Sequence, residues 1–165
     1  MRRATVVLAG VLIAGCARFG WSDHVLITAA AASHDVVFVC QEVPEFDGPG
    51  YEWRLETRDG AVLRQLFRDS DGNGRCDAAV WSADGTTLAI VERGTIHVVD
   101  VGWALAHPEE RKTHWFLRQF SYSTNDVSLR VDHLRFASAR EITFDLSGRS
   151  MRLIIPSPLV RGRRT

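Results

Sequence analysis

Four oxygen-bearing side chains with regular spacing are the strongest candidate for chemistry in this sequence. They follow the pattern Asp69-x-Asp71-x-Asn73-Gly74-x-x-Asp77. Ca²⁺ prefers about six to eight hard oxygen ligands, which alternate positions of a tight loop can supply, and a glycine in the sixth place allows the turn. The spacing therefore predicts a calcium site at Asp69, Asp71, Asn73 and Asp77. The alternative is a solvated turn, since Asp, Asn and Gly are common turn residues.

The same four positions resemble the calcium loops of EF-hands and of FG-GAP propeller blades. The twelfth position departs from the EF-hand pattern, because Val80 stands where that family has Glu. Without Glu at this position an EF-hand is disfavoured. We therefore expect a calcium loop between two β-strands. A hydrolytic or ligand-binding site on this loop is the alternative to a non-catalytic function.

The first sixteen residues differ from the rest of the chain. Met1-Arg2-Arg3 is basic, and the apolar run that follows is shorter than the ~20 residues of a spanning helix. Small residues then lead to Cys16. This ending resembles the lipobox of bacterial lipoproteins, which implies a signal peptide over residues 1–15 and acylation of Cys16. A plain secretory signal and an uncleaved anchor are the alternatives.

The lipoprotein resemblance also implies a location. Residues 16–23 would form the lipidated cysteine and a short tether to the membrane. Ala17 follows Cys16, so the Asp that retains lipoproteins in the inner membrane is absent. The resemblance therefore implies a protein of the cell envelope, at the outer membrane if the cell has one. Weak calcium sites fill more readily in such an exported protein.

Cys40 and Cys76 remain once Cys16 is set aside. An even number of cysteines in an exported chain suggests a disulfide, and two buried free thiols are the alternative. Neither cysteine has a second Cys or a His at metal-ligand spacing, which argues against zinc. Neither has an adjacent His, and no Ser lies in a Gly-x-Ser-x-Gly motif. The sequence therefore favours a non-catalytic protein.

The charges of the chain are balanced, with 20 Lys and Arg against 20 Asp and Glu. A nucleic-acid partner needs a dense basic face, which this balance does not support. The expected partners are the membrane, through Cys16, and a protein or a second copy of the chain.

Short β-rich runs separated by turn signals must position these residues. Asp84-Gly85 and Arg93-Gly94 divide residues 77–100 into a three-stranded antiparallel meander. Residues 51–57 and 61–67 form a hairpin around Asp59-Gly60, preceded by strands at 24–28 and 35–40. Residues 42–50, which contain Pro44 and Pro49, are expected to be a loop. Later strands are expected at 113–120, 129–136, 141–146 and 151–155, and a loop or one short helix before Pro108.

The meander resembles the β-propeller repeat of the TolB type. Its residues Trp81-Ser82-Ala-Asp84-Gly85 match the Trp-Ser-x-Asp-Gly signature, and the third strand ends in Asp100. The resemblance covers one blade well and two more weakly, since Ala137-Ser138-Ala139 lacks the Asp-Gly turn. It implies an all-β fold of propeller-like blades.

An internal repeat agrees with this resemblance, because Leu63-Arg64-Gln65 returns as Leu117-Arg118-Gln119. The repeat predicts three four-stranded units, of which the last is incomplete. They make up a domain of residues 24–157, which is followed by a basic tail at 158–165. A propeller needs at least about four blades to close. The chain is therefore an incomplete or open propeller, an oligomer, a β-sandwich, or a fragment of a longer propeller. Trp53, Trp81 and Trp115 are expected in the core, with an aromatic ligand groove as the alternative.

Overall fold

The computed structural model describes residues 24–45, 48–69, 74–92, 95–109, 115–119 and 131–155, with the side chains of 69 and 115–119 left out. The predicted signal peptide, Cys16, the tether and the basic tail lie outside these residues. Within the described part, no helix is long and apolar enough to cross a membrane.

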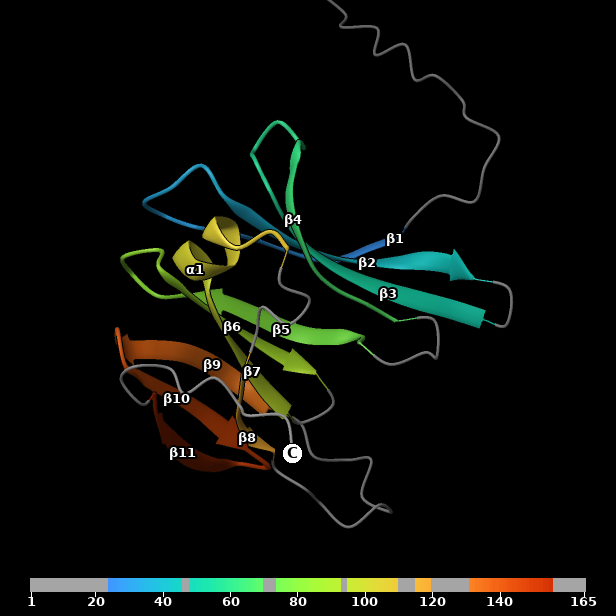
Figure 1. The fold of residues 1–165 in the computed structure, drawn as a ribbon. Coiled ribbons are helices and arrows are strands. Elements are labelled where there is room, and N and C mark those ends of the chain that lie inside the picture. The colour runs from blue at the N-terminus through green and yellow to red at the C-terminus, as the bar shows by residue number, and fades with distance from the viewer. Residues whose placement is uncertain are drawn as a thin grey trace, which may run out of the picture.

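Three antiparallel sheets, stacked one upon another, make up the described chain (Figure 1). The first sheet contains β1 (His24–Ala30), β2 (Val37–Glu45), β3 (Gly48–Glu56) and β4 (Val62–Asp69). The second contains β5 (Cys76–Trp81), β6 (Thr87–Glu92), β7 (Thr95–Asp100) and β8 (Trp115–Gln119). The third contains β9 (Val131–Ser138), β10 (Glu141–Leu146) and β11 (Arg149–Ile154). Each sheet is a meander of consecutive strands.

The all-β prediction and the three blades are confirmed, with the third unit showing three strands among the described residues. Three stacked layers rule out the alternative of a two-sheet sandwich. The stack is an open, propeller-like arrangement. The short helix α1 (Val101–Ala106) follows β7. The Asp100 carboxylate caps its N-terminus by accepting a hydrogen bond from the backbone amide of Trp103 at 2.9 Å.

The expected loop at residues 42–50 is wrong. β2 and β3 continue through this stretch as one long hairpin, in which Pro44 pairs with Pro49. The pairing with β1 ends at Glu42 and the pairing with β4 ends at Tyr51. Among the described residues the tip of the hairpin therefore has no outer strand that would need the amide which a proline lacks.

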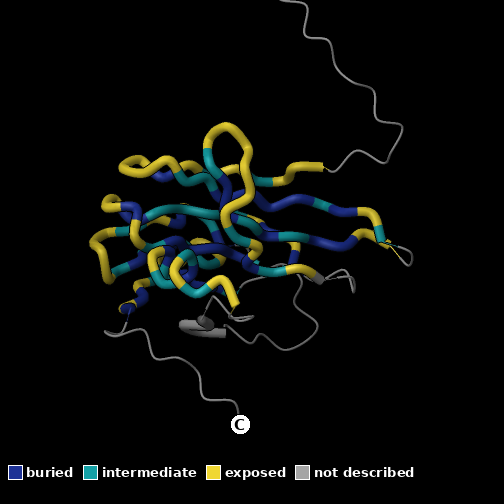
Figure 2. The backbone as a smooth tube through the Cα atoms, turned by 45° about the horizontal axis from the view of Figure 1, so that its top comes forward, coloured by how far each residue is buried: buried dark blue, intermediate teal, exposed yellow. Residues whose placement is uncertain are grey.

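Two apolar layers hold the stack together, and Figure 2 shows the buried backbone running through the middle of the strands. The first layer lies between the first and second sheets; its fully buried side chains include Phe38, Trp53, Leu55, Leu88 and Ile90. The second layer lies between the second and third sheets; it includes Val91, Ile96, Val98, Ile142 and Phe144. Because side chains alternate along a strand, the second sheet is apolar on both faces.

The turn at Asp84-Gly85 joins the first two sheets. The Asp84 carboxylate accepts hydrogen bonds from the Ser82 hydroxyl at 2.6 Å and from the Thr86 amide at 3.1 Å. Its backbone carbonyl accepts from Ser33 Oγ at 2.8 Å and contacts His34 Nε2 at 3.1 Å, in the loop between β1 and β2. The predicted Trp-Ser-x-Asp-Gly turn is therefore both a hairpin turn and a contact between blades.

Replacing Asp84 by alanine should lower the free energy of unfolding by about 1 kcal/mol at pH 7, because the Ser82 hydroxyl and Thr86 amide lose their acceptor. The Ser82 hydroxyl, followed by the Thr86 amide, holds the pKa of the Asp84 carboxyl below its usual range. A depressed folded-state pKa gives stability that is present above the unfolded pKa of about 3.9 and is lost as the pH falls through the folded value. The difference in free energy of unfolding between wild type and Asp84→Ala, measured by urea titration, should become smaller over that acidic range. A difference that does not change with pH would contradict the role given to the Asp84 carboxylate.

Candidate functional site

The outer face of the first sheet, which points away from the second sheet, is the best candidate for a functional surface. The strand register places its side chains in three rows that run from β1 to β4. The rows are Ala30, Val37, Glu56, Val62; then Thr28, Val39, Arg54, Gln65; then Val25, Gln41, Glu52, Arg68.

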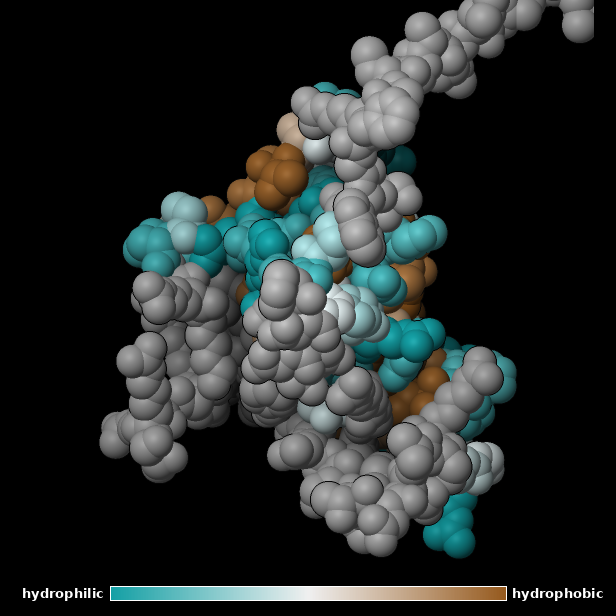
Figure 3. Space-filling view, turned by 90° about the vertical axis from the view of Figure 1, so that its right-hand side faces the viewer, coloured by the Kyte–Doolittle hydropathy of each residue, from teal (hydrophilic) through white to brown (hydrophobic). Residues whose placement is uncertain are grey.

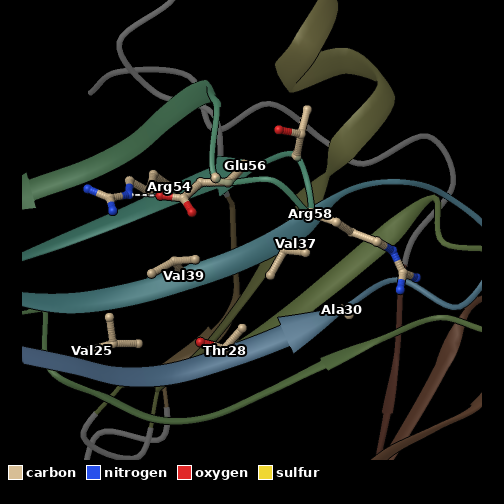
Figure 4. Close-up of a pocket in the computed structure, with 10 residues that line it drawn as sticks. Val25, Thr28, Ala30, Val37, Val39, Arg54, Glu56 and Arg58 are labelled. Atoms are coloured by element: carbon tan, nitrogen blue, oxygen red, sulfur yellow. Dashed lines mark hydrogen bonds and ion pairs between the residues drawn. The ribbon is translucent and has the colours of Figure 1, made fainter. Parts of the chain in front are cut away.

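Aliphatic side chains occupy the β1 and β2 half of this face. Val25, Val37 and Val39 line an open hollow together with Thr28 and Ala30. Figure 4 shows these side chains pointing to the same side of the sheet, with Arg54 and Glu56 along one border. Val25 is 56% exposed at the β1 edge of the hollow, Val37 is half-buried, and Val39 is buried.

Polar side chains occupy the β3 and β4 half, and they are already paired with one another. Glu52 accepts from Gln41 Nε2 at 3.1 Å and from Gln65 Nε2 at 2.7 Å. Arg54 forms ion pairs with Glu52 and Glu56. Glu52 and Glu56 thus share one guanidinium, so these three side chains are hydrogen-bonded and ion-paired but carry net negative charge, which suits the border of a contact better than its centre.

Exposed large aliphatic residues concentrate on the first sheet. Five are exposed among the described residues: Val25, Leu26, Val62, Leu63 and Ile154. All except Ile154 belong to β1 or β4. In the space-filling view, apolar surface appears in the upper part of the molecule, where the first sheet lies, and also lower down on the right (Figure 3).

The outer face of the third sheet differs, because among the described residues it is mostly polar around a single exposed large aliphatic residue, Ile154. Arg152 Nε pairs with Glu141 at 2.7 Å, and Arg135 Nε donates to Thr143 Oγ1 at 3.1 Å. The two ends of the stack are therefore chemically different. One presents an aliphatic half-face and the other presents charges in pairs.

The predicted calcium loop is only partly described. Asp71 and Asn73 lie outside the described residues, as does the side chain of Asp69, the last residue of β4. The exposed side chain of Asp77 follows the start of β5. Among the described residues, no three His, Cys, Asp or Glu side chains gather as a metal site. Calcium binding, and the hydrolase or ligand site placed on this loop, stay predictions.

Calcium should raise the melting temperature by several degrees over EGTA if the loop binds it. A ligand of the folded state adds about 2.7 kcal/mol at a hundredfold excess over its Kd. Asp71→Ala should abolish the shift, whereas Asp59→Ala, in the turn between β3 and β4, should preserve it. No calcium shift in the wild-type chain would leave a plain turn at residues 69–77.

Gly74, at the end of that loop, is fixed by contacts that the sequence did not reveal. Its carbonyl oxygen accepts from Trp53 Nε1 at 2.5 Å, and its amide donates to Glu92 Oε1 at 2.6 Å. The other oxygen of Glu92 lies 2.8 Å from Nε2 of the buried His97. Glu92 thus ties the loop end to the second sheet.

The predicted core tryptophans agree with the structure where it describes them. Trp53 is fully buried between the first two sheets, and the partly buried Trp81 donates from Nε1 to the carbonyl of Ala29 at 2.8 Å. The side chain of Trp115 is outside the described set. Cys40 and Cys76 are buried free thiols in the structure, and their disulfide stays a prediction.

Sequence reasoning did not find the outer face of the first sheet. The alternation of apolar and charged residues along β3 indicated that one face of its sheet would be buried. Whether the other face stays open depends on how the sheets stack, which the alternation does not show. The available signal was Val25 and Val62, aliphatic residues on the two edge strands of that sheet.

The fold and this face define the chain as an all-β protein of open, propeller-like blades. No protein-family model matches the sequence, and no curated protein matches it. Among solved structures, Kluyveromyces lactis Hsv2 is similar at 20% identity and a TM-score of 0.44, over 72% of this chain and 37% of that one. A form of K. lactis Hsv2 with loop 6CD replaced by a Gly-Ser linker gives 21% identity and a TM-score of 0.44, over 72% and 35%. The chain thus spans little more than a third of those structures.

Proposed function

We propose that this chain is a lipid-anchored protein of the bacterial cell envelope and that its stack of sheets is a non-catalytic protein-interaction module. Acylated Cys16 would hold it on the membrane, at the outer membrane where the cell has one. Two or three acyl chains suffice for stable anchoring, because each buried methylene contributes about 0.8 kcal/mol.

The observation that carries the proposal is the aliphatic half of the first sheet's outer face. The second sheet is covered on both sides, and the third sheet ends the stack with paired charges. Among the described residues, the first sheet presents Val25 and Ala30 to water on this face, beside the half-buried Val37 and the buried Val39. Exposed apolar patches of this kind mark interaction sites when polar residues border them.

The chemistry of this face indicates the kind of partner. Within the stack, the second sheet covers the inner face of the first with aliphatic side chains of β6 and β7, such as Leu88, Ile90 and Val99. A partner protein that presents an aliphatic β-sheet face would extend the stack by the same packing. The paired polar half of the face, Glu52, Arg54 and Glu56, would border that contact.

Introducing a charge on the aliphatic half should abolish partner binding. A tagged chain is captured from detergent-solubilised envelopes as wild type, as Val25→Glu and as Ile154→Glu. Val25 and Ile154 are both 56% exposed but lie at opposite ends of the stack, so Ile154→Glu is the matched control. We expect the same partner with wild type and Ile154→Glu, and at least a tenfold loss with Val25→Glu.

Equal capture by all three chains would contradict this docking face. A captured partner that proves to be a second copy of the chain would replace the hetero-partner with self-association, which sedimentation of the purified chain would verify. Turnover of a small molecule by the pure chain without any stable partner would overturn the interaction proposal. Labelling with a palmitate analogue that persists in Cys16→Ser would overturn the anchor.

A further inference from the structure

Cys40 and Cys76 belong to different sheets, yet they meet in the apolar layer between them. Cys40 lies in β2 and is 0% exposed, and Cys76 begins β5 and is 4% exposed. Each sulfur lies 3.9 Å from the carbonyl oxygen of Gly74. The two thiols also shift each other's pKa, downward for Cys40 and upward for Cys76. The sulfurs are therefore direct neighbours across the junction of the first two sheets.

The surroundings hold this pair in place. Gly74, two residues before Cys76, is anchored through Trp53 Nε1 on one side and Glu92 Oε1 on the other. Trp53 is itself fully buried, with its ring 4.9 Å from that of His97. The negative charges of Glu92 and Asp77 both raise the pKa of the thiols and so disfavour a thiolate.

We propose that Cys40 and Cys76 form a disulfide that joins the first and second sheets when the chain folds under oxidising conditions. The free thiols of the structure are then the reduced form of this cross-link. Both sulfurs already lie against one carbonyl oxygen, and the pair must close to the S–S bonding distance of about 2.0 Å. The inference depends on the export assumed in the proposed function but not on any partner.

Burial determines when the bond can form. An oxidant cannot reach either sulfur once the two sheets have packed, so oxidation must occur during folding or after local opening. Burial raises the pKa of the Cys76 thiol, whereas the hydrogen bond from Cys76 lowers the pKa of the Cys40 thiol. These pKa shifts belong to the packed layer, so after opening either thiol can form the attacking thiolate, Cys40 among them.

The reaction is a thiol–disulfide exchange with an external disulfide such as glutathione disulfide. The Cys40 thiolate attacks one oxidant sulfur, which breaks the oxidant's S–S bond, forms a mixed disulfide and releases one glutathione thiol. The Cys76 sulfur then attacks the Cys40 sulfur and displaces the second glutathione. The oxidant gains two electrons, and the protons of Cys40 and Cys76 end on the two released thiols.

The cross-link would compensate for the open stack. A closed propeller holds each blade from two sides, but among the described residues the first sheet is held through one layer, the one that contains these cysteines. A covalent bond at this point restrains the opening of the first sheet from the second. It acts mainly by constraining the unfolded chain.

The test refolds the full chain carrying Cys16→Ser in a glutathione redox buffer, followed by thiol counting with a maleimide in denaturant. We expect both thiols to be lost in the refolded chain, with recovery of two after reduction. Cys40→Ala in the same background should retain its remaining thiol or carry one glutathione. Reduction should lower the urea midpoint of the oxidised chain. It should not change the midpoint of the double variant that carries both Cys40→Ala and Cys76→Ala.

A chain that refolds to a protease-resistant state with both thiols still reactive in denaturant would overturn the proposal. So would a disulfide whose reduction leaves the urea midpoint unchanged, because the bond would then not join packed sheets. The refolding assay contains no membrane or partner, so its outcome is independent of the docking face.

Discussion

Replacing Trp53 by alanine should lower the free energy of unfolding by about 4 kcal/mol, the largest effect expected of a single side chain here. The indole is fully buried, with ring centroids 4.9 Å from Phe67 and 6.5 Å from Phe38. It touches the second sheet as well, through His97 and through the hydrogen bond to Gly74. Truncation would leave a cavity between the two sheets. It would also leave the Gly74 carbonyl oxygen without the hydrogen bond from Trp53 Nε1.

Two further variants separate these contributions in urea titrations followed by circular dichroism. Trp53→Phe retains much of the apolar volume but removes the donor to Gly74, so about 2 kcal/mol should be lost. Trp103→Ala, on α1 and only partly buried, should cost clearly less than Trp53→Ala. Equal losses for Trp53→Ala and Trp103→Ala would show that Trp53 does not hold the sheets together.

Replacing Gly74 by alanine should cost about 3 kcal/mol, the second large effect. Gly74 has a φ of +90°, which costs an L-residue about 1–2 kcal/mol. An added Cβ would also lie in severe conflict with the Phe67 ring and 3.3 Å from Tyr51 Cβ. Because Phe67 packs against Trp53, the ring cannot simply move away, and overpacking adds about 1–3 kcal/mol.

Gly60 provides the matched control for this prediction. Its φ is +88°, but no atom lies within 4 Å of the position that a Cβ would take. Gly60→Ala should therefore show the backbone cost alone, about 1 kcal/mol. If both glycine variants lose the same stability in urea titrations, the close contact of Gly74 with Phe67 has no energetic weight.

The parts of the fold that depend on local sequence could be predicted. The turn at Asp84-Gly85 is determined by its own side chain and by a glycine at a φ of +70°. Alternation in β3 places Tyr51, Trp53 and Leu55 on one buried face. The repeat of Leu63-Arg64-Gln65 indicated how many such units follow one another.

The features that depend on distant contacts could not be predicted. Pro44 and Pro49 normally indicate a loop, and they fit a hairpin here only because β1 and β4 end before they reach its tip. The link from Glu92 to Gly74 joins residues of different elements and follows no sequence motif. The aliphatic face at Val25 and Val37 is open to the proposed partner only because no sheet covers it among the described residues.

The most direct test of the account is photo-crosslinking in living cells with a photoreactive amino acid placed at Val25 and, in a second strain, at Ile154. The two positions have the same exposed fraction and lie on opposite outer faces of the stack. We expect a discrete cross-linked protein from position 25 and none from position 154. Adducts from position 154 alone, or the same adducts from both positions, would contradict the proposal that the first sheet's outer face is the docking surface.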